Sequence, residues 1–448
     1  MEITQLLPEF GGLIWTLLAF VIALSVIVAI HEYGHYIVGR WSGIHADVFS
    51  LGFGPVLLSR VDKRGTRWQL AALPFGGYVK FKGDSNAASG TSDEEVMRQM
   101  TAEERRQTMT GAPLWARAAT VAAGPLFNFA LTILLFTGIF MFQGKVAEPL
   151  TVGELRATPS VQELQVGDVL LGIEGTPTPS FDDAEGFEAF LEGLPQQNTL
   201  TYDVERDGAR MEVTGPYVYP PVVSQVVPRS AAIDAGMEAG DVIMSIDGVP
   251  IFAFDQLKQR VESSDGETLG LEVWRNGEIL DLALTPKRTD EPLPDGGFQA
   301  VYRIGIVGGM VFEPATEAAG PVEAVQGAVL RTYDIAAGSL SGLWHVIAGN
   351  ISSCNLSGPI GIAETSGAMA SQGGQSFLTF IAVLSTAVGL LNLFPVPVLD
   401  GGHLVFYAYE AVAGKPPSDK ALRMLMSVGL VLILSLMVFA LTNDLFCP

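Results

Sequence analysis

Cysteine, histidine and basic side chains are scarce in this chain. Its 448 residues include two cysteines and five histidines, and 26 Lys and Arg stand against 48 Asp and Glu, a formal net charge of −22. Cys354 and Cys447 have no CxxC or zinc-finger spacing, so no thiolate metal site can be built from them. The shortage of positive charge argues against nucleic acid as a partner, because phosphate binding requires a basic face.

Charge of either sign is also limited. Only 17% of the residues are charged, and the mean hydropathy of +0.35 is too high for an ordinary soluble protein. Four apolar stretches have about the 20 residues needed to cross a bilayer, at 11–38, 118–142, 376–399 and 424–442. Residues 1–10 contain two acids and no Lys or Arg, so the first stretch is predicted to be a retained span and not a signal peptide. We therefore expect a multi-pass α-helical membrane protein with four transmembrane helices and soluble domains.

The placement of Lys and Arg predicts the topology. Residues 1–39 and the tail after Arg423 contain neither, whereas 40–117 contains eleven and the loop 400–423 three. The positive-inside rule places these two segments in the cytoplasm. Both termini and residues 143–375 are then outside, and that segment carries 12 basic against 33 acidic residues.

The pentapeptide His31-Glu32-Tyr33-Gly34-His35 directly continues the first apolar stretch. On a helix, residues four apart project from nearly the same face, so His31 and His35 can offer two imidazole nitrogens to one metal ion. Glu32 lies beside the metal, where a carboxylate can take a proton from an attacking water. The alternative is a polar cap at a helix end. Ionisable groups at membrane depth are costly and usually functional, which favours the metal site.

The third apolar stretch ends in a second polar segment, residues 389–402. By the predicted topology the inner ends of the first and third spans reach the same depth, so Asp400 can supply an oxygen ligand. Pro395 and Pro397 prevent a regular helix, and the freed backbone groups could hold a substrate strand. Asp400 could instead cap a helix, and Asn392 is either a substrate or oxyanion donor or an interhelical hydrogen-bond partner.

Residues 51–55 and 68–80 alternate apolar and small residues with Gly and Pro breaks, a pattern typical of strands. We expect a membrane-associated β-hairpin or sheet near His35, within a region spanning 40–117. An unwound substrate could pair with its segment from Leu70 to Lys80, so Gly77 and Tyr78 are candidate substrate-binding residues. The polar stretch from Gly83 to Thr110 is predicted to be a cytoplasmic excursion.

The external segment contains a repeat. Residues 167–177 match 240–250, and 199–208 match 268–277, which predicts two tandem mixed α/β domains at 147–221 and 222–310. Helices are expected at 181–191 and 254–261. Residues 226–241 of the second copy resemble the PDZ domains of bacterial envelope proteases, which bind peptide C-termini by adding a strand to a sheet edge. The first copy lacks the Ser-Ala-Ala run, so its groove is expected to be altered. An amphipathic helix at 324–347, within a region 322–375 that ends in a loop, should lie on the outer membrane face.

These features together resemble the site-2 protease family of zinc intramembrane metalloproteases. The resemblance rests on HEYGH ending the first span, on Asn392-x-x-Pro395-x-Pro397-x-Leu-Asp400-Gly ending the third (376–402), and on the repeats between spans two and three. Two further segments, 124–128 and 76–80, fit motifs of that family. The resemblance covers nearly the whole chain.

The resemblance implies one Zn²⁺ per chain held by His31, His35 and Asp400, with Glu32 as the catalytic glutamate and Asn392 in contact with substrate. It also implies a stress-response protease of the bacterial inner membrane, with its active site near the cytoplasmic side. Its expected substrates are single-span membrane proteins already trimmed outside, typically an anti-sigma factor, and remnant signal peptides. Two other functions stay open from the residues alone: an inert membrane PDZ adaptor and a divalent-metal transporter.

Overall fold

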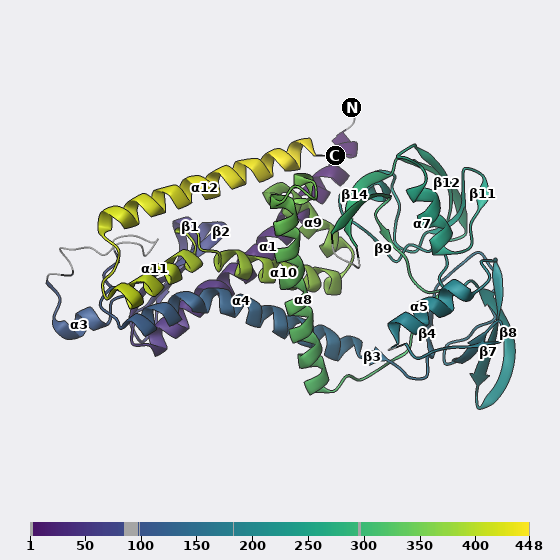
Figure 1. Ribbon diagram of the computed structural model, residues 1–448, viewed down its shortest axis with the longest axis horizontal. Helices are drawn as coiled ribbons and strands as arrows, with labels where there is room; N and C mark the ends of the chain where they lie inside the picture. Colours follow the sequence, from purple (N-terminus) through teal and green to yellow (C-terminus); the bar gives the residue numbers. More distant parts are fainter. Residues whose placement is uncertain (1–2, 85–96, 98, 182, 294–296, 448) are drawn as a thin grey trace. The chain divides into compact units, whose positions relative to one another are not determined.

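The computed structural model describes residues 3–84, 97, 99–181, 183–293 and 297–447 (Figure 1). The chain divides into two compact units. The first comprises residues 1–139, 322–344 and 356–447, and the second comprises 140–321 and 345–355. Residues 85–96 and 98 of the predicted excursion between Gly83 and Thr110 lie outside the described residues. Its described end contains the short helix α3 (Ala102–Arg106). Neither cysteine has a free thiol.

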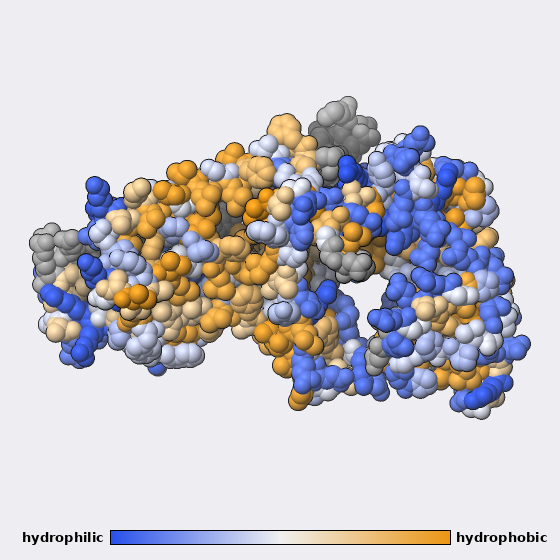
Figure 2. Space-filling model, viewed as in Figure 1, coloured by the Kyte–Doolittle hydropathy of each residue, from blue (hydrophilic) through white to orange (hydrophobic). Residues whose placement is uncertain are grey.

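Among the described residues, four helices are long and apolar enough to cross a membrane. They are α1 (Ile3–Trp41), α4 (Leu114–Gln143), α10 (Gly374–Asn392) and α12 (Asp419–Phe446). Figure 2 shows hydrophobic side chains gathered along α12, where Leu430, Val431 and Leu432 are each more than half exposed. Helices satisfy their own backbone hydrogen bonds, so an apolar surface of this kind suits hydrocarbon. The four predicted spans are present as apolar helices.

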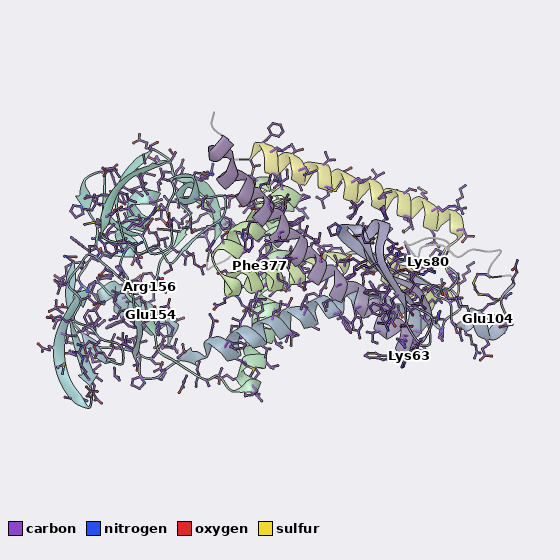
Figure 3. All side chains as sticks on the ribbon, turned by 180° about the vertical axis from the view of Figure 1, so that it is seen from behind. Lys63, Lys80, Glu104, Glu154, Arg156 and Phe377 are labelled. Carbon is purple, nitrogen blue, oxygen red and sulfur yellow. The ribbon has the colours of Figure 1, made fainter. Side chains whose placement is uncertain are left out.

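Close packing joins α1, α4 and α10. A side chain at Gly34 of α1 would place its Cβ 2.5 Å from the carbonyl oxygen of Ala123 in α4, so the absence of a Cβ permits the approach. On the other side of α4, the buried Ser385 Oγ of α10 donates to the carbonyl oxygen of Asn128 over 2.9 Å. The three helices also share a buried apolar cluster of Ala23, Ile27, Leu131 and Ile381, against which Phe377 packs (Figure 3).

The third span ends earlier than the sequence predicts. α10 stops at Asn392, and a turn segment leads to a separate helix, α11 (Asp400–Ala413), where a loop was expected at 400–423. Pro395 and Pro397 lack backbone N–H groups and disfavour helix in the residues before them, which explains the break. Asp400 is therefore the first residue of a new helix.

The region after the repeats is more helical than predicted. α8 (Pro321–Ile347) contains the expected amphipathic helix and exposes Leu330 and Tyr333. Residues 348–375, expected to be a loop, contain the short helix η1 (Ser353–Asn355) and α9 (Pro359–Ser371). Asp444 of α12 accepts hydrogen bonds from the N–H groups of Gly358 and Ile360, over 2.8 and 3.0 Å. This carboxylate satisfies the N–H groups at the start of α9. Because it comes from a distant part of the chain, the local sequence does not predict where α9 begins.

The predicted β element is formed by β1 (Ala46–Val61) and β2 (Arg67–Phe81), which pair antiparallel. Both strands bend, so that residues 46–51 pair with 67–70 on one side and with 77–81 on the other. Gly52 and Gly54 supply positive φ angles at the bend in β1. Lys63 lies between the strands and Lys80 near the end of β2 (Figure 3). The outer half of β1 is exposed and apolar, which suits contact with a membrane.

The second unit contains two copies of one sheet. The strand order is β6-β5-β7-β8 in the first copy and β11-β10-β12-β13 in the second, in line with the sequence repeat. The strands of the first are Val169–Ile173 (β5), Thr176–Pro177 (β6), Thr199–Arg206 (β7) and Ala209–Pro216 (β8). Those of the second are Val242–Ile246 (β10), Val249–Pro250 (β11), Leu269–Arg275 (β12) and Glu278–Leu284 (β13). Helices α5 (Ala184–Gly193) and α7 (Phe254–Glu262) occupy equivalent places.

The same buried ion pair recurs in both copies. Asp168 and Asp241 are completely buried, and each is held by the arginine that ends the neighbouring strand: Arg206 Nε lies 2.7 Å from Asp168, and Arg275 Nε 2.6 Å from Asp241. Burial alone would raise the pKa of Asp168, but the hydrogen bonds from Arg206 and from the backbone of Gln165, together with the charge of Arg206, hold that pKa below its ordinary value. The repeated Gly-Asp and Arg-x-Gly elements of the sequence thus mark one structural feature.

The first copy is discontinuous in sequence. Its strand β4 (Val152–Leu155) pairs with β17 (Phe312–Pro314), and β3 (Lys145–Val146) pairs with β18 (Thr316–Glu317). Its core includes Met310, Val311 and Phe312. The second copy is completed by β9 (Gln225–Val226), α6 (Ala231–Asp234), the pair β14 (Lys287–Pro292) and β15 (Phe298–Arg303), and β16 (Ile306–Val307). The tandem boundaries 147–221 and 222–310 miss this arrangement, in which the second copy is inserted into the first.

Candidate metal centre

His31 and His35 lie one turn apart in α1, on the face packed against α4. Their Nε2 atoms are 3.2 Å apart, and the two rings meet edge to face. Only 11% and 13% of their side-chain surfaces are exposed. The helical spacing predicted from the sequence therefore does place both imidazoles at one point.

Asp400 reaches the same point from the start of α11. Its Oδ2 lies 3.2 Å from His31 Nε2 and 3.5 Å from His35 Nε2. The next two residues, Gly401 and Gly402, are tightly packed: a Cβ on either would come within 2.2 Å of a carbonyl oxygen in the preceding turn segment. Backbone contacts on these glycines thus fix the start of α11 and the position of the carboxylate.

The three ligand atoms have the spacing that a tetrahedral metal ion requires. Ligands about 2.0–2.1 Å from a tetrahedral Zn²⁺ stand about 3.3 Å from one another, and the observed separations are 3.2, 3.2 and 3.5 Å. Asp400 Oδ2 is buried and has no hydrogen-bond partner among the described residues, as expected of an oxygen that binds a cation. Within the described part of the chain, this is the one group of three or more His, Cys, Asp or Glu that could hold a metal ion.

Gly124 of α4 keeps the space between the ligands open. A Cβ at this position would lie 2.4 Å from His35 Nε2 and 2.8 Å from His31 Nε2, where a bound ion would have to be. The residues present therefore fit zinc: two imidazoles, one carboxylate, and a cavity between them that a single methyl group would fill.

α4 also contacts the far nitrogens of both imidazoles. His35 Nδ1 lies 2.8 Å from the carbonyl oxygen of Thr120, and His31 Nδ1 lies 3.2 Å from the side-chain amide of Asn128. Because a carbonyl oxygen can only accept, His35 carries its proton on Nδ1 and its Nε2 lone pair faces Asp400. This is the tautomer needed for metal binding through Nε2.

Glu32, the residue next to His31, lies against β2. Its carboxylate accepts a hydrogen bond from the backbone of Val79, and a Cβ at Gly77 would lie 3.1 Å from Glu32 Cγ. Among the described strands, only β1 pairs with the segment 77–81. The β element thus brings an edge strand to the carboxylate that would serve as the base.

The other predicted substrate-binding residues lie at the end of α10, in the turn before α11 and on β2. Asn392 is the last residue of α10, and its amide donates to the carbonyl oxygen of Val388 over 3.0 Å. Tyr78 accepts a hydrogen bond from Gln69, with 3.0 Å between the two atoms. Pro395 and Pro397 lie in the turn between α10 and α11. Pro397 packs against Gly429 of α12.

The remaining histidines belong elsewhere. His403 is largely buried on α11, with its ring 6.0 Å from that of Phe406. His45 lies 3.6 Å from Asp47, and His345 packs on Phe298. These contacts suit structural roles.

A helix-borne His-Glu-x-x-His with a third ligand from a separate helix, set among apolar membrane-length helices, defines a zinc metallopeptidase of the membrane. The chain belongs to peptidase family M50, whose model matches residues 19–436. It is a site-2-type metalloprotease, and the adaptor and transporter alternatives fall away.

Two relatives illustrate the similarity. A protein of Agrobacterium fabrum, described as a candidate zinc metalloprotease, is 38% identical, and the match covers 97% of each chain. The regulator of sigma-E protease RseP of Escherichia coli is 33% identical, with 96% of this chain and 98% of the relative covered.

In the sequence, Gly124 and Asn128 belong to a segment of small residues that fits a family motif, and the sequence alone predicts no chemical role for either residue. Their spacing of four, continued back to Thr120, places all three on one face of a helix. The presence of Asn128 in an apolar helix was the available signal, because a buried amide in a membrane needs a partner.

Proposed function

We propose that this protein cleaves peptide bonds within the membrane, with one Zn²⁺ held by His31, His35 and Asp400 and with Glu32 as general base. The observation that carries the proposal is the mutual spacing of the three ligand atoms around a cavity kept open by Gly124. Zinc, when bound there, supplies a Lewis acid that activates water and polarises the scissile carbonyl. Glu32 takes the proton of the attacking water and passes it to the leaving amine.

Matched substitutions test these roles. Glu32→Gln should bind zinc as the wild type does and lose proteolysis, because the base lies beside the ligands. Asp400→Asn should lower both zinc content and proteolysis. Metal content is measured by atomic spectroscopy on protein purified in detergent, and cleavage with a tagged single-span substrate. Cleavage by Glu32→Gln near the wild-type rate would contradict the general-base assignment, and unchanged zinc in Asp400→Asn would remove Asp400 from the ligand set.

The substrate is proposed to bind as an extended strand along the edge of β2. A helical substrate hides its carbonyls in hydrogen bonds and must unwind before attack. The edge segment beginning at Gly77 lies against Glu32. The turn segment after Asn392, which contains Pro395 and Pro397, is not helical, so its backbone can offer hydrogen-bonding groups to a substrate strand. Gly77→Pro removes an N–H from this edge and should raise KM strongly while zinc content stays at the wild-type level.

The membrane orientation is proposed from the charge pattern, with both termini and the two repeats in the periplasm of the bacterial inner membrane. Both cysteines are disulfide-bonded and lie in segments assigned to the outside, where disulfides persist. A single cysteine at Ala209 should be labelled by an impermeant maleimide in intact cells. A single cysteine at Ala102 should be labelled by the same reagent in permeabilised cells. Labelling of Ala102→Cys in intact cells would overturn the orientation.

The two repeats are proposed to be PDZ domains that admit only trimmed substrates, such as an anti-sigma factor after a first external cut, or a remnant signal peptide. Since β3 and β18 pair, Val146 and Thr316 are register partners, and residues 147–315 can be replaced by a short linker. The shortened protein should keep cleaving a trimmed substrate and should also cleave an untrimmed one. Continued rejection of the untrimmed substrate by a zinc-bound variant would place the gate elsewhere, with α8 as the next candidate.

A further inference from the structure

Asn128 has a buried side-chain amide, and one end of this amide lacks a hydrogen-bond partner among the described residues. Its side chain is 0% exposed, in the middle of α4. Nδ2 lies 3.2 Å from His31 Nδ1, while Oδ1 is buried and has no hydrogen-bond partner among the described residues. An unpaired buried carbonyl is costly.

The two ends of a carboxamide have nearly the same shape, so hydrogen bonding decides which one faces His31. If Nδ2 faces the ring, Nδ1 must accept, and the ring proton lies on Nε2, between Asp400 and His35. If Oδ1 faces the ring, Nδ1–H donates to it and the Nε2 lone pair is free. Only the second orientation matches His35, whose Nδ1 donates to the carbonyl oxygen of Thr120.

We propose that Asn128 is a positioning residue of the metal centre: its amide oxygen accepts a hydrogen bond from His31 Nδ1 and so holds the His31 ring with Nε2 directed at the ion. The inference rests on the proposed function, because it requires His31 to be a ligand. α4 then contributes no ligand of its own but supports both. Thr120 holds His35, Asn128 holds His31, and Gly124, midway between them on the same face, leaves the space for the ion.

An acceptor of this kind fixes the tautomer of a metal-bound histidine and increases the basicity of the ligating nitrogen. Asn128 is also well fixed itself. Its backbone carbonyl accepts from Ser385 and from Thr132, and its Cβ faces Gly389 of α10. The amide therefore has a defined place against His31 and does not depend on zinc for its position.

The test measures the zinc dissociation constant of the full chain in detergent by competition with a chelator. Asn128→Leu keeps the size and removes the acceptor, and Asn128→Ala removes the acceptor without requiring a larger side chain to fit. Both should weaken zinc binding about 10- to 100-fold. Asn128→Asp keeps oxygen acceptors at the same place and should stay within about threefold of the wild type.

Ser385→Ala is the matched control, because it removes a buried hydrogen bond to the same residue of α4 without touching His31. It should bind zinc like the wild type. Thermal unfolding of the zinc-free proteins checks that each variant folds. Wild-type affinity in Asn128→Leu or Asn128→Ala would overturn the inference, and so would a loss in Asn128→Asp equal to that in Asn128→Leu, which would mean that Nδ2 faces the ring. Failure of the wild type itself to bind zinc would overturn the proposed function instead.

Discussion

Gly124→Ala is the smallest change that should empty the metal centre. The new methyl carbon would lie 2.4 Å from His35 Nε2 and 2.8 Å from His31 Nε2. Both distances are far below van der Waals contact, and the carbon would occupy the region between the ligands where the ion must lie. Zinc and the methyl group therefore compete for one volume.

The expected loss of zinc affinity can be estimated from the cost of relieving the clash between the new methyl group and the two histidines. To restore ordinary contact α4 would have to retreat by about 1 Å, and overpacking of this kind costs about 1–3 kcal/mol. That cost alone weakens zinc binding about 5- to 150-fold. It is a lower bound, because a methyl group that stays in place excludes the ion altogether.

Gly138→Ala is the control for this experiment. Gly138 lies in the same helix, and a Cβ there would meet nothing within 4 Å. Both substitutions gain the same helix propensity, so their difference isolates the clash. Zinc affinity is measured by chelator competition and proteolysis on a tagged single-span substrate. If Gly124→Ala bound zinc as tightly as Gly138→Ala, the ion would not lie on the α4 side of the two histidines and the assigned geometry would be refuted.

Three further substitutions probe the scaffold. Asp168→Asn removes the buried counterion of Arg206 and should lower the melting temperature at neutral pH. Since the pKa of Asp168 is lowered, the difference from wild type in thermal unfolding should shrink as the pH falls from 3.8 downward. Arg117→Gln breaks the 3.0 and 2.6 Å hydrogen bonds to Glu410 that tie α4 to α11, and zinc affinity should fall about tenfold, with partial recovery when Glu410→Gln is added. Asp444→Ala uncaps α9 and should lower the melting temperature by the equivalent of about 1–2 kcal/mol, while zinc affinity stays unchanged.

The meeting of His31, His35 and Asp400, the proposed ligands, could be predicted from the sequence. His31 and His35 share a face by helical spacing alone, and the depth expected for Asp400 was inferred from the distribution of Lys and Arg between loops. The break before Asp400 is visible in the two prolines. Their consequence, a separate helix α11, is not, because the packing of Gly401 and Gly402 on the turn decides it.

Other features depend on contacts between distant parts of the chain. The roles of Gly124 and Asn128 appear only when α4 is placed against α1, since neither is a metal ligand type. α9 begins where the Asp444 carboxylate reaches it. The repeat was visible in the matched Gly-Asp and Arg motifs, but no local pattern shows that β17 returns to pair with β4.

The pairing of β17 with β4 affects the order in which the two copies can fold during synthesis. The first copy begins at β3 and β4, yet its sheet partner and part of its core, Val311 and Phe312, follow the whole of the second copy in the chain. During synthesis the first copy keeps an unpaired sheet edge while the second copy is completed. The ordinary N-terminal-first sequence of domain folding is thereby reversed. A chain that stalls after residue 310 would present a finished second copy and an unfinished first one, so quality control of nascent chains would act on the first copy.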